Sequence, residues 1–227
     1  MKTNYYEIEL LKNVDNEFKD EFYHYSKILE YSKGSSPFDG DNLLNHFYII
    51  LDGKIKTYQI NFENSKEQTI FIYKRGDMFD VISLLDKKPH EVIYEVLQDS
   101  KVLRVPMQKV RDWIENSNTF KNIFFPYLAS KMRYTEELAI ELSLYDVKER
   151  LIHLLVDSIN PNNHFKYMLL ENLSNSEISK LLGTVRHVLE RAIKQLKYEK
   201  IIKTSRKNIT VVNLEKLLEK TTKMLHK

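Results

Sequence analysis

Three side chains between residues 186 and 191 carry the strongest chemical signal in this sequence. Arg186, His187 and Arg191 fall on the polar face of a predicted helix whose apolar residues recur every three or four positions. Arginine can donate two hydrogen bonds to guanine, and a basic helix face of this kind fits the major groove of DNA. We therefore predict that these three residues contact DNA bases.

A second helical pattern lies directly before them. Ser174 is a predicted N-cap, with Glu177 as its capping-box partner, and Gly183 ends the helix where a left-handed residue is favoured. Residues 173–198 thus predict a helix, a tight turn and a second helix, although an ordinary helical hairpin fits these residues equally well. At the start of the first helix, we expect Ser174 and Ser176 to contact DNA phosphates.

Two short strands follow the helices. Residues 201–212 are rich in isoleucine and valine around a polar turn at 205–208. A helix-turn-helix followed by a small basic hairpin is a winged helix. We expect Lys203, Arg206 and Lys207 of this wing to contact DNA phosphates.

The distribution of charge agrees with nucleic-acid binding. Residues 174–227 contain ten lysines and three arginines against five glutamates, a net charge of +8, whereas the whole chain carries only +3. A basic C-terminal block behind an acidic body is expected of a DNA-binding module. A solvated lysine-rich surface is the simpler alternative.

Composition excludes several classes of site. The sequence contains no cysteine, which excludes disulfides, cysteine-bound zinc, cysteine-bound iron–sulfur clusters and thiol catalysis. Its first residues lack a basic start followed by an apolar run, and no apolar run is long enough to span a bilayer. We expect a cytoplasmic protein with no membrane partner, no metal and no cofactor.

The N-terminal half changes from a helical to a strand pattern. Residues 5–31 predict mostly helix at the start, with Phe18, Phe22, Tyr25 and Ile28 or Leu29 at helical spacing. Several short strands follow from about residue 45 to 105, which indicates a small sandwich or barrel.

The strand boundaries rest on turn residues. Asp52-Gly53 predicts a hairpin between Phe47–Leu51 and Lys54–Ile60. Gln68–Tyr73 predicts another strand, and the last two are expected at Glu91–Leu97 and Val102–Val105.

A long helical pattern begins near residue 119. Its apolar positions alternate by three and four, which is typical of a coiled-coil seam between two helices, although packing within its own domain is the alternative. We predict dimerisation through this seam. The seam residues are Phe125, Leu128, Met132, Thr135, Ala139 and Leu142.

Two further helices are predicted after the seam. Asp146 is a predicted N-cap, and Asn213 is a predicted cap for a final helix. The residues expected to face inward from that final helix are Leu214, Leu217, Leu218 and Leu225.

The order of these elements resembles the CRP/FNR superfamily of bacterial transcription regulators. The segments most similar to the family are Tyr48–Ile55, Gly76–Phe79, Asp146–Leu151 and the helix-turn-helix. The resemblance implies an α+β fold with an N-terminal β-roll of the jelly-roll-like, cyclic-nucleotide-binding type, a long dimerisation helix and a C-terminal winged helix-turn-helix. It implies domains at residues 1–117, 118–144 and 145–227.

The sequence departs from the family where effectors bind. Cyclic-nucleotide-binding members carry a glutamate for the ribose and an arginine for the phosphate, and these positions read Val81 and Glu91 here. We therefore expect no cyclic-nucleotide binding by the usual mechanism. Any of His24, His46 and His90 could be an axial ligand of a haem, although the simpler interpretation of each is an ordinary surface or core histidine.

The recognition helix also departs from the family. Arg186 and Arg191 match its pattern, but a histidine, His187, stands where many members have a glutamate. A glutamate there would accept a hydrogen bond from cytosine, so we expect a different DNA half-site.

The resemblance and the residues together predict a homodimeric, sequence-specific regulator of transcription that binds double-stranded DNA and is not an enzyme. The β-roll is expected either to bind a small effector of unknown identity or to hold the DNA-binding domains in one fixed orientation. RNA polymerase is a candidate partner at the loop 160–164, where a plain surface turn is the favoured interpretation. A cupin-like metal enzyme and a regulatory module that does not bind DNA are the alternatives, and the seven dispersed histidines argue against the first.

Overall fold

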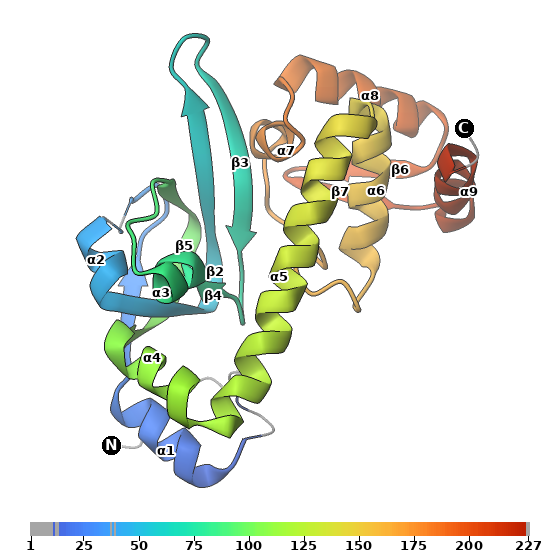
Figure 1. The fold of residues 1–227 in the computed structure, drawn as a ribbon. Coiled ribbons are helices and arrows are strands. Elements are labelled where there is room, and N and C mark those ends of the chain that lie inside the picture. Colours follow the sequence, from blue (N-terminus) through green and yellow to red (C-terminus); the bar gives the residue numbers. More distant parts are fainter. Residues whose placement is uncertain (1–10, 12–13, 37, 39, 226–227) are drawn as a thin grey trace. The chain divides into compact units, whose positions relative to one another are not determined.

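The structure is a computed structural model that describes residues 11, 14–36, 38 and 40–225 (Figure 1). The chain divides into two compact units. The first contains residues 1–57 and 72–133, and the second contains residues 58–71 and 134–227. Helices and a sheet are mixed along the chain, which confirms the predicted α+β class.

The elements follow the predicted order of β-roll, long helix and winged helix. Up to the long helix they are α1 (Asn16–His24), β1 (Lys27–Tyr31), α2 (Gly40–Asn45), β2 (His46–Asn61), β3 (Lys66–Tyr73), β4 (Met78–Phe79), α3 (Val81–Asp86), β5 (Ile93–Pro106), α4 (Met107–Asn116) and α5 (Asn118–Leu144). The remaining elements are α6 (Val147–Ile159), α7 (Asn175–Leu181), α8 (Arg186–Tyr198), β6 (Ile202–Ser205), β7 (Asn208–Val211) and α9 (Leu214–Leu225).

A five-stranded sheet forms the predicted β-roll. Its strands have the order β1-β5-β2-β3, and β4 pairs with β2. β-Branched and aromatic side chains from these strands are buried, including Ile50, Ile55, Phe79 and Val96. Burial of these apolar side chains is the main source of stability for the roll.

The predicted hairpin at Asp52-Gly53 is wrong, because β2 continues through these residues. Gly53 has a φ of +88°, a left-handed conformation that favours glycine. A Cβ atom on Gly53 would lie 2.5 Å from the carbonyl oxygen of Asp99 and would also collide with Ser100. The glycine therefore permits a close approach of β5 to β2 and does not make a chain reversal.

The two strands predicted around residues 91–105 are one strand, β5. Polar residues between them stay in the sheet because β1 pairs with them, Glu30 opposite Lys101 and Tyr31 opposite Ser100. Backbone pairing of this kind satisfies the amide and carbonyl groups whatever the side chains are. Hence the polar residues 98–101 interrupt the apolar pattern without ending the strand.

The predicted helix in residues 5–31 is shorter in the structure, and its first residues lie largely outside the described part. α1 begins after Asp15, whose carboxylate accepts a 2.7 Å hydrogen bond from the Phe18 amide, and it ends at His24. The residues Ile28 and Leu29 lie in β1, opposite Leu103 and Val102 of β5, so their assignment to the helix is wrong.

The long helix α5 begins and ends where the sequence predicts it, with Pro126 inside it. Buried aromatic side chains face the first unit from its N-terminal half, among them Phe120, Phe124 and Tyr127. The Tyr127 hydroxyl donates a 2.9 Å hydrogen bond to the Met78 carbonyl and accepts one of 2.9 Å from the Met78 amide. These contacts fix the helix to β4.

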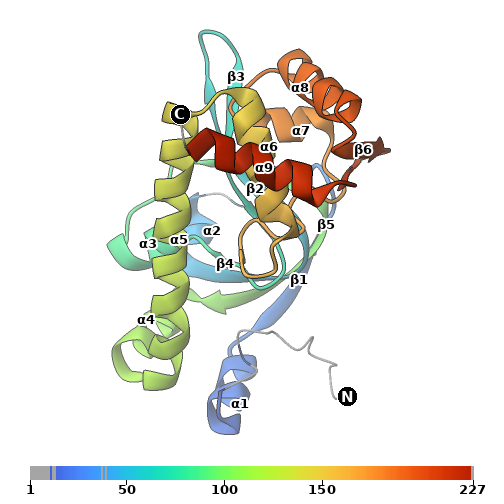
Figure 2. The ribbon, with the colours of Figure 1, turned by 90° about the vertical axis from the view of Figure 1, so that its right-hand side faces the viewer.

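The second unit is a helical cluster closed by a short hairpin. α6 packs against α8 and α9, and α7 packs against α8 (Figure 2). The predicted N-cap at Asp146 is confirmed as a full capping box with Glu149. Asn213 likewise accepts a 3.0 Å hydrogen bond from the Lys216 amide, as predicted.

Only part of the predicted inward face of α9 is confirmed. Leu217 is fully buried, whereas Leu214 and Leu218 are 48% and 44% exposed. α9 has α6 as its main neighbour, so one narrow stripe of the helix is covered. The side chain of Leu225 lies outside the described residues.

The tip of the β2–β3 hairpin, residues 58–71, belongs to the second unit. Glu67 forms a 2.6 Å ion pair with Lys180 of α7, and the Gln68 side-chain amide donates a 3.3 Å hydrogen bond to the Leu181 carbonyl. The Phe71 ring packs edge-on against Phe165. Three different types of contact thus attach this tip to the helical cluster.

Candidate nucleic-acid interface

The first helix of the helix-turn-helix, α7, begins with the predicted capping box. The Glu177 amide donates a 3.3 Å hydrogen bond to the Ser174 hydroxyl, and the Glu177 carboxylate accepts a 2.7 Å hydrogen bond from the Ser174 amide. The Ser174 hydroxyl also donates to that carboxylate. Ser174 and Ser176 are both half-buried at this helix start, so their expected phosphate contacts stay a prediction.

The turn after α7 is sharp because of one glycine. Gly183 has a φ of +65°, and the Thr184 amide donates a 2.9 Å hydrogen bond to the Ser179 carbonyl. A Cβ atom on Gly183 would lie 2.8 Å from the Leu142 side chain. The predicted glycine turn is confirmed, and it sets the direction in which α8 leaves.

The second helix, α8, separates buried from exposed side chains along its length. Leu189, Ile193 and Leu196 are buried against the unit. The predicted base-contacting residues are all exposed on the other side, namely Arg186, His187 and Arg191. The structure therefore brings these three together on an accessible helix face.

The sequence places Glu190 on this face as well, but its ion pair with Arg186 was not predicted. The Arg186 guanidinium donates a 2.7 Å hydrogen bond from Nε to the Glu190 carboxylate, one turn further along α8. This interaction is the main reason that the pKa of Glu190 is lowered. The four-residue spacing of an arginine and a glutamate was the available signal.

The wing is formed as predicted. Its strands pair in antiparallel register, with Lys203 opposite Thr210, and Lys207 adopts a φ of +56° in the connecting turn. Lys203, Arg206 and Lys207 are exposed. Free cationic side chains at a turn tip can follow a phosphate backbone without reading sequence.

A hollow of about 340 Å³ lies between α8 and the wing. Its lining includes Lys194 and Lys197 from the helix and Thr204 and Ser205 from the wing. All four can donate hydrogen bonds to phosphate oxygens. The two lysines extend the basic surface beyond the residues predicted from sequence, and their helical spacing after Arg191 was the signal for them.

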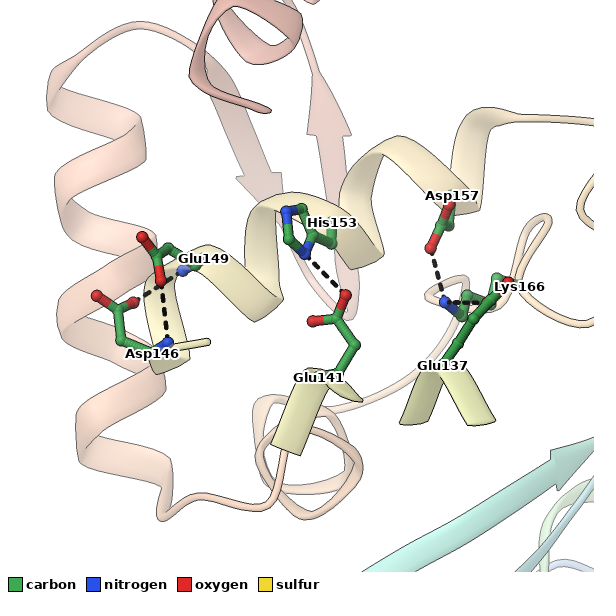
Figure 3. A network of polar contacts seen from close by, with 7 residues as sticks. All are labelled: Glu137, Glu141, Asp146, Glu149, His153, Asp157 and Lys166. Carbon is green, nitrogen blue, oxygen red and sulfur yellow. Dashed lines mark hydrogen bonds and ion pairs between the residues drawn. The ribbon is translucent and has the colours of Figure 1, made fainter. Parts of the chain in front are cut away.

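A network of ion pairs fixes α6 to the end of α5 (Figure 3). His153 Nδ1 lies 2.7 Å from Glu141 Oε1, and Lys166 Nζ lies 2.8 Å from Asp157 and 3.2 Å from Glu137. The hydrogen bond to Glu141 raises the pKa of His153 above its ordinary value. The first helix of the winged helix is thereby held to the helix that precedes it.

The seam predicted for dimerisation is uncovered within one chain. Phe125, Met132, Thr135 and Ala139 are exposed, Met132 to 66%, and Leu128 is half-buried. Leu142 is 37% exposed and also lies close to Gly183. A solvent-exposed apolar stripe along one helix is typical of a coiled-coil interface seen without its partner helix.

The positions that bind the nucleotide in cyclic-nucleotide-binding family members hold apolar and acidic groups in this chain. Val81 is buried at the start of α3, and Glu91 is exposed. Asp80 is buried and its carboxylate lies 2.9 Å from His90 Nδ1 and 2.6 Å from the Ser83 hydroxyl. The interior beside it is filled by aromatic rings in edge-to-face contact, which are Phe38, Tyr48, Phe79 and Tyr94.

The other two histidines named as haem candidates contact aromatic rings, and the buried Nδ1 of His46 has no hydrogen-bond partner among the described residues. The His24 ring contacts Tyr25, and burial lowers the pKa of His46. Within the described part of the chain, no group of three or more histidine, aspartate or glutamate residues could hold a metal ion. None of the described helices has the length and apolarity that a membrane span requires.

Two family models match this chain in the order of its units. The cyclic nucleotide-binding domain matches residues 28–117, and the Crp-like helix-turn-helix domain matches residues 149–220. The chain belongs to the CRP/FNR superfamily of transcription regulators. The members described next are distantly similar to it.

Two curated CRP/FNR relatives illustrate that distance. The "Global nitrogen regulator" of Synechococcus elongatus is 23% identical over 193 residues, which cover 82% of this chain and 86% of the relative. The "Probable transcriptional regulator flp" of Lacticaseibacillus casei is 24% identical over 208 residues, which cover 92% and 93%.

Solved CRP/FNR structures share the fold. A CooA mutant from Carboxydothermus hydrogenoformans superposes with a TM-score of 0.74 at 18% identity, covering 97% of each chain. FixK2 from Bradyrhizobium japonicum gives a TM-score of 0.72 at 18% identity, covering 86% of this chain and 96% of that one. At this level of identity the similarity establishes the fold alone.

Proposed function

We propose that this protein is a homodimeric transcription regulator that reads a specific DNA sequence. The observation that carries the proposal is the exposed face of α8, where Arg186, His187 and Arg191 lie together beside a basic wing. Two such helices, related by a twofold axis along α5, would enter major grooves about 34 Å apart. The exposed seam on α5 supports the dimer.

In this proposal the recognition helix α8 contacts bases, and the wing contacts phosphates. Arg186 and Arg191 donate hydrogen bonds to guanine. Because His187 stands where many family members have a glutamate, the DNA half-site of this protein differs from theirs at the base pair that this residue contacts. Lys203, Arg206 and Lys207 contact phosphate and add affinity for any sequence. Ser174 and Ser176 position the start of α7 on the backbone.

The β-roll would serve as a regulatory domain and not as a catalytic one. Residues 1–117 form this domain in the proposal, residues 118–144 the dimerisation helix and residues 145–227 the DNA-binding domain. A buried Asp80 and an exposed Glu91 argue against a cyclic nucleotide as the effector. Because its proposed target is chromosomal DNA, we expect the protein to act in the cytoplasm, with RNA polymerase as a further partner.

The test is selection of an operator followed by measurement of affinity. Genomic fragments bound by the full chain would be sequenced to define a site, and fluorescence anisotropy would compare that site with scrambled DNA. We expect a twofold-symmetric site, and a preference for it of roughly a thousandfold or more at physiological salt. Equal affinity for selected and scrambled DNA would overturn the proposal.

A further inference from the structure

The exposed face of α8 carries one acidic side chain among basic ones. Glu190 is the one acidic residue in the sequence of this helix. Its exposed neighbours on α8 are Arg186, His187, Arg191 and Lys194. Because successive helix residues are about 100° apart, Glu190 projects between Arg186 and His187. A carboxylate on a face that meets DNA is repelled by the phosphates, so a hydrogen-bond donor on the DNA is needed to offset this repulsion.

Two side chains hold the Glu190 carboxylate in place. Arg186 Nε donates a 2.7 Å hydrogen bond to Glu190 Oε1, and this bond is the largest cause of the lowered pKa of Glu190. A hydrogen bond with the side chain of Asn175, the first residue of α7, lowers this pKa further. The carboxylate is therefore ionised at neutral pH and is tied to both helices of the helix-turn-helix.

Both members of the ion pair keep hydrogen-bonding groups for DNA. Arg186 uses Nε for Glu190, and its two terminal nitrogens have no hydrogen bond with any residue that the structure describes. An ionised carboxylate can accept about four hydrogen bonds, so Glu190 keeps acceptor positions beside those that it already uses. The side chains of Arg186 and Glu190 are 67% and 43% exposed, so a base edge can reach both.

The Arg186–Glu190 pair thus presents two donors beside an acceptor. In the major groove, guanine offers two acceptors, N7 and O6, and its paired cytosine offers one donor, the N4 amino group. An A·T pair offers an acceptor, a donor and a second acceptor, an order that the pair of side chains does not match. Cytosine is also the base whose groove edge has a donor and no acceptor of its own, so it suits a carboxylate best.

From this match we propose that Glu190 determines sequence specificity by accepting a hydrogen bond from cytosine N4, in the same base pair whose guanine Arg186 contacts. The bond from Arg186 Nε to Glu190 also orients the terminal nitrogens of the guanidinium toward that guanine. Glu190 is then both a base-contacting residue and a positioning residue for Arg186. This assignment rests on the proposed function, because it applies only to a protein that reads a DNA sequence.

Base analogues in the selected DNA site test the assignment atom by atom. Each cytosine of one half-site is replaced in turn by pyrimidin-2-one, which lacks the amino group, and fluorescence anisotropy measures the affinity of the full chain. We expect the wild type to lose at least about tenfold in affinity at one cytosine, and Glu190→Ala to show no such loss there. Because the analogue weakens the base pair in every measurement, the difference between wild type and variant is the quantity that counts.

The partner guanine is tested in the same way. The guanine opposite that cytosine is replaced by 7-deazaguanine, which lacks the N7 acceptor. This replacement should weaken binding of the wild type and leave the affinity of Arg186→Ala unchanged. Convergence of the two losses on one base pair is the result expected of a side-chain pair that reads it together.

Two further variants serve as controls. Glu215→Ala, at an exposed position on α9, should respond to every analogue as the wild type does. Glu190→Gln retains an uncharged acceptor oxygen and should keep part of the preference for cytosine, because hydrogen bonds to uncharged acceptors are weaker. Thermal unfolding would verify that all variants are folded.

The outcomes separate this assignment from the proposed function. If a specific site is selected but Glu190→Ala responds to the analogues as the wild type does, Glu190 belongs to a solvated surface ion pair, and the assignment is overturned while the proposed function stands. Losses that fall on two different base pairs would overturn the shared reading of one pair. Failure to select any site would overturn both, since the assignment requires a DNA sequence to read.

Discussion

The Arg186 guanidinium and the Glu190 carboxylate form an ion pair of 2.7 Å along the exposed face of α8. Arg186 is therefore not free to donate from Nε until Glu190 releases it or DNA displaces it. An exposed pair of this kind is weak and easily exchanged. Its presence places a negative charge on the face that the proposal directs toward DNA.

Removing this carboxylate should strengthen binding to DNA of any sequence. Glu190→Gln deletes a charge that repels phosphate and frees Arg186, so we expect several-fold tighter binding to scrambled DNA at low salt, with the gain shrinking as salt is raised. Anisotropy titrations would measure this, with the exposed α9 variant Glu215→Gln as control. Weaker binding to scrambled DNA would show that Glu190 is not oriented toward the backbone.

Replacing a lysine of the wing should lower affinity without changing sequence preference. Lys203→Ala removes one expected phosphate contact, so the slope of log affinity against log salt should become shallower by about 0.9. The measurement needs both a selected site and scrambled DNA, with Lys216→Ala on α9 as the matched control. A change in base preference would instead assign Lys203 to direct recognition.

A charge in the exposed seam should separate the dimer. Met132→Glu would bring two like charges together between the paired helices, which is strongly destabilising for an apolar interface. Sedimentation at about 1 µM should show a monomer, while the nearby exposed Glu136→Gln variant stays dimeric. If Met132→Glu still sediments as a dimer, the interface lies elsewhere.

Cyclic nucleotides should not bind. Val81 offers no acceptor to a ribose hydroxyl, and Glu91 puts a carboxylate where a cation is needed for the phosphate. Calorimetry with about 1 mM cAMP or cGMP should give no saturable heat. Micromolar binding would require a different phosphate clamp, for which Lys87 and Lys88 are the nearest candidates in sequence.

Stability should depend on pH through His153. Its pKa in the folded state is raised by Glu141, so its contribution is fully present below the ordinary histidine pKa of about 6.5 and is lost as pH rises through the higher folded value. The difference in free energy of unfolding between wild type and His153→Gln should therefore be largest at about pH 6 and shrink by pH 9. A difference that grows with pH would contradict the assignment.

The winged helix was predictable because its signals are local. Ser174 with Glu177, Asp146 and Gly183 each specify a helix end through neighbouring residues. The turn predicted at Asp52-Gly53 is wrong because the glycine instead allows β5, a strand about forty-five residues further along the chain, to approach β2 closely. Such a distant partner leaves no trace in the surrounding pattern.

The distance in sequence between contacting residues also explains which features of the sites could not be predicted. Arg186 and Glu190 lie four residues apart, so their pairing could have been predicted. The hollow between α8 and the wing combines residues from separate elements, so it is a property of packing. No spacing in the sequence marks such a hollow.

The second unit takes residues 58–71 from the middle of the β-roll sequence, and this affects how the chain can be divided. A fragment that begins at the α5–α6 junction would lack Glu67 and Gln68, leaving Lys180 without its ion-pair partner and the Leu181 carbonyl without its donor. A recombination event or a laboratory truncation at one point would thus separate surfaces that belong to one folded body. Exchange of DNA-binding modules between such regulators would succeed best when the hairpin tip is exchanged with them.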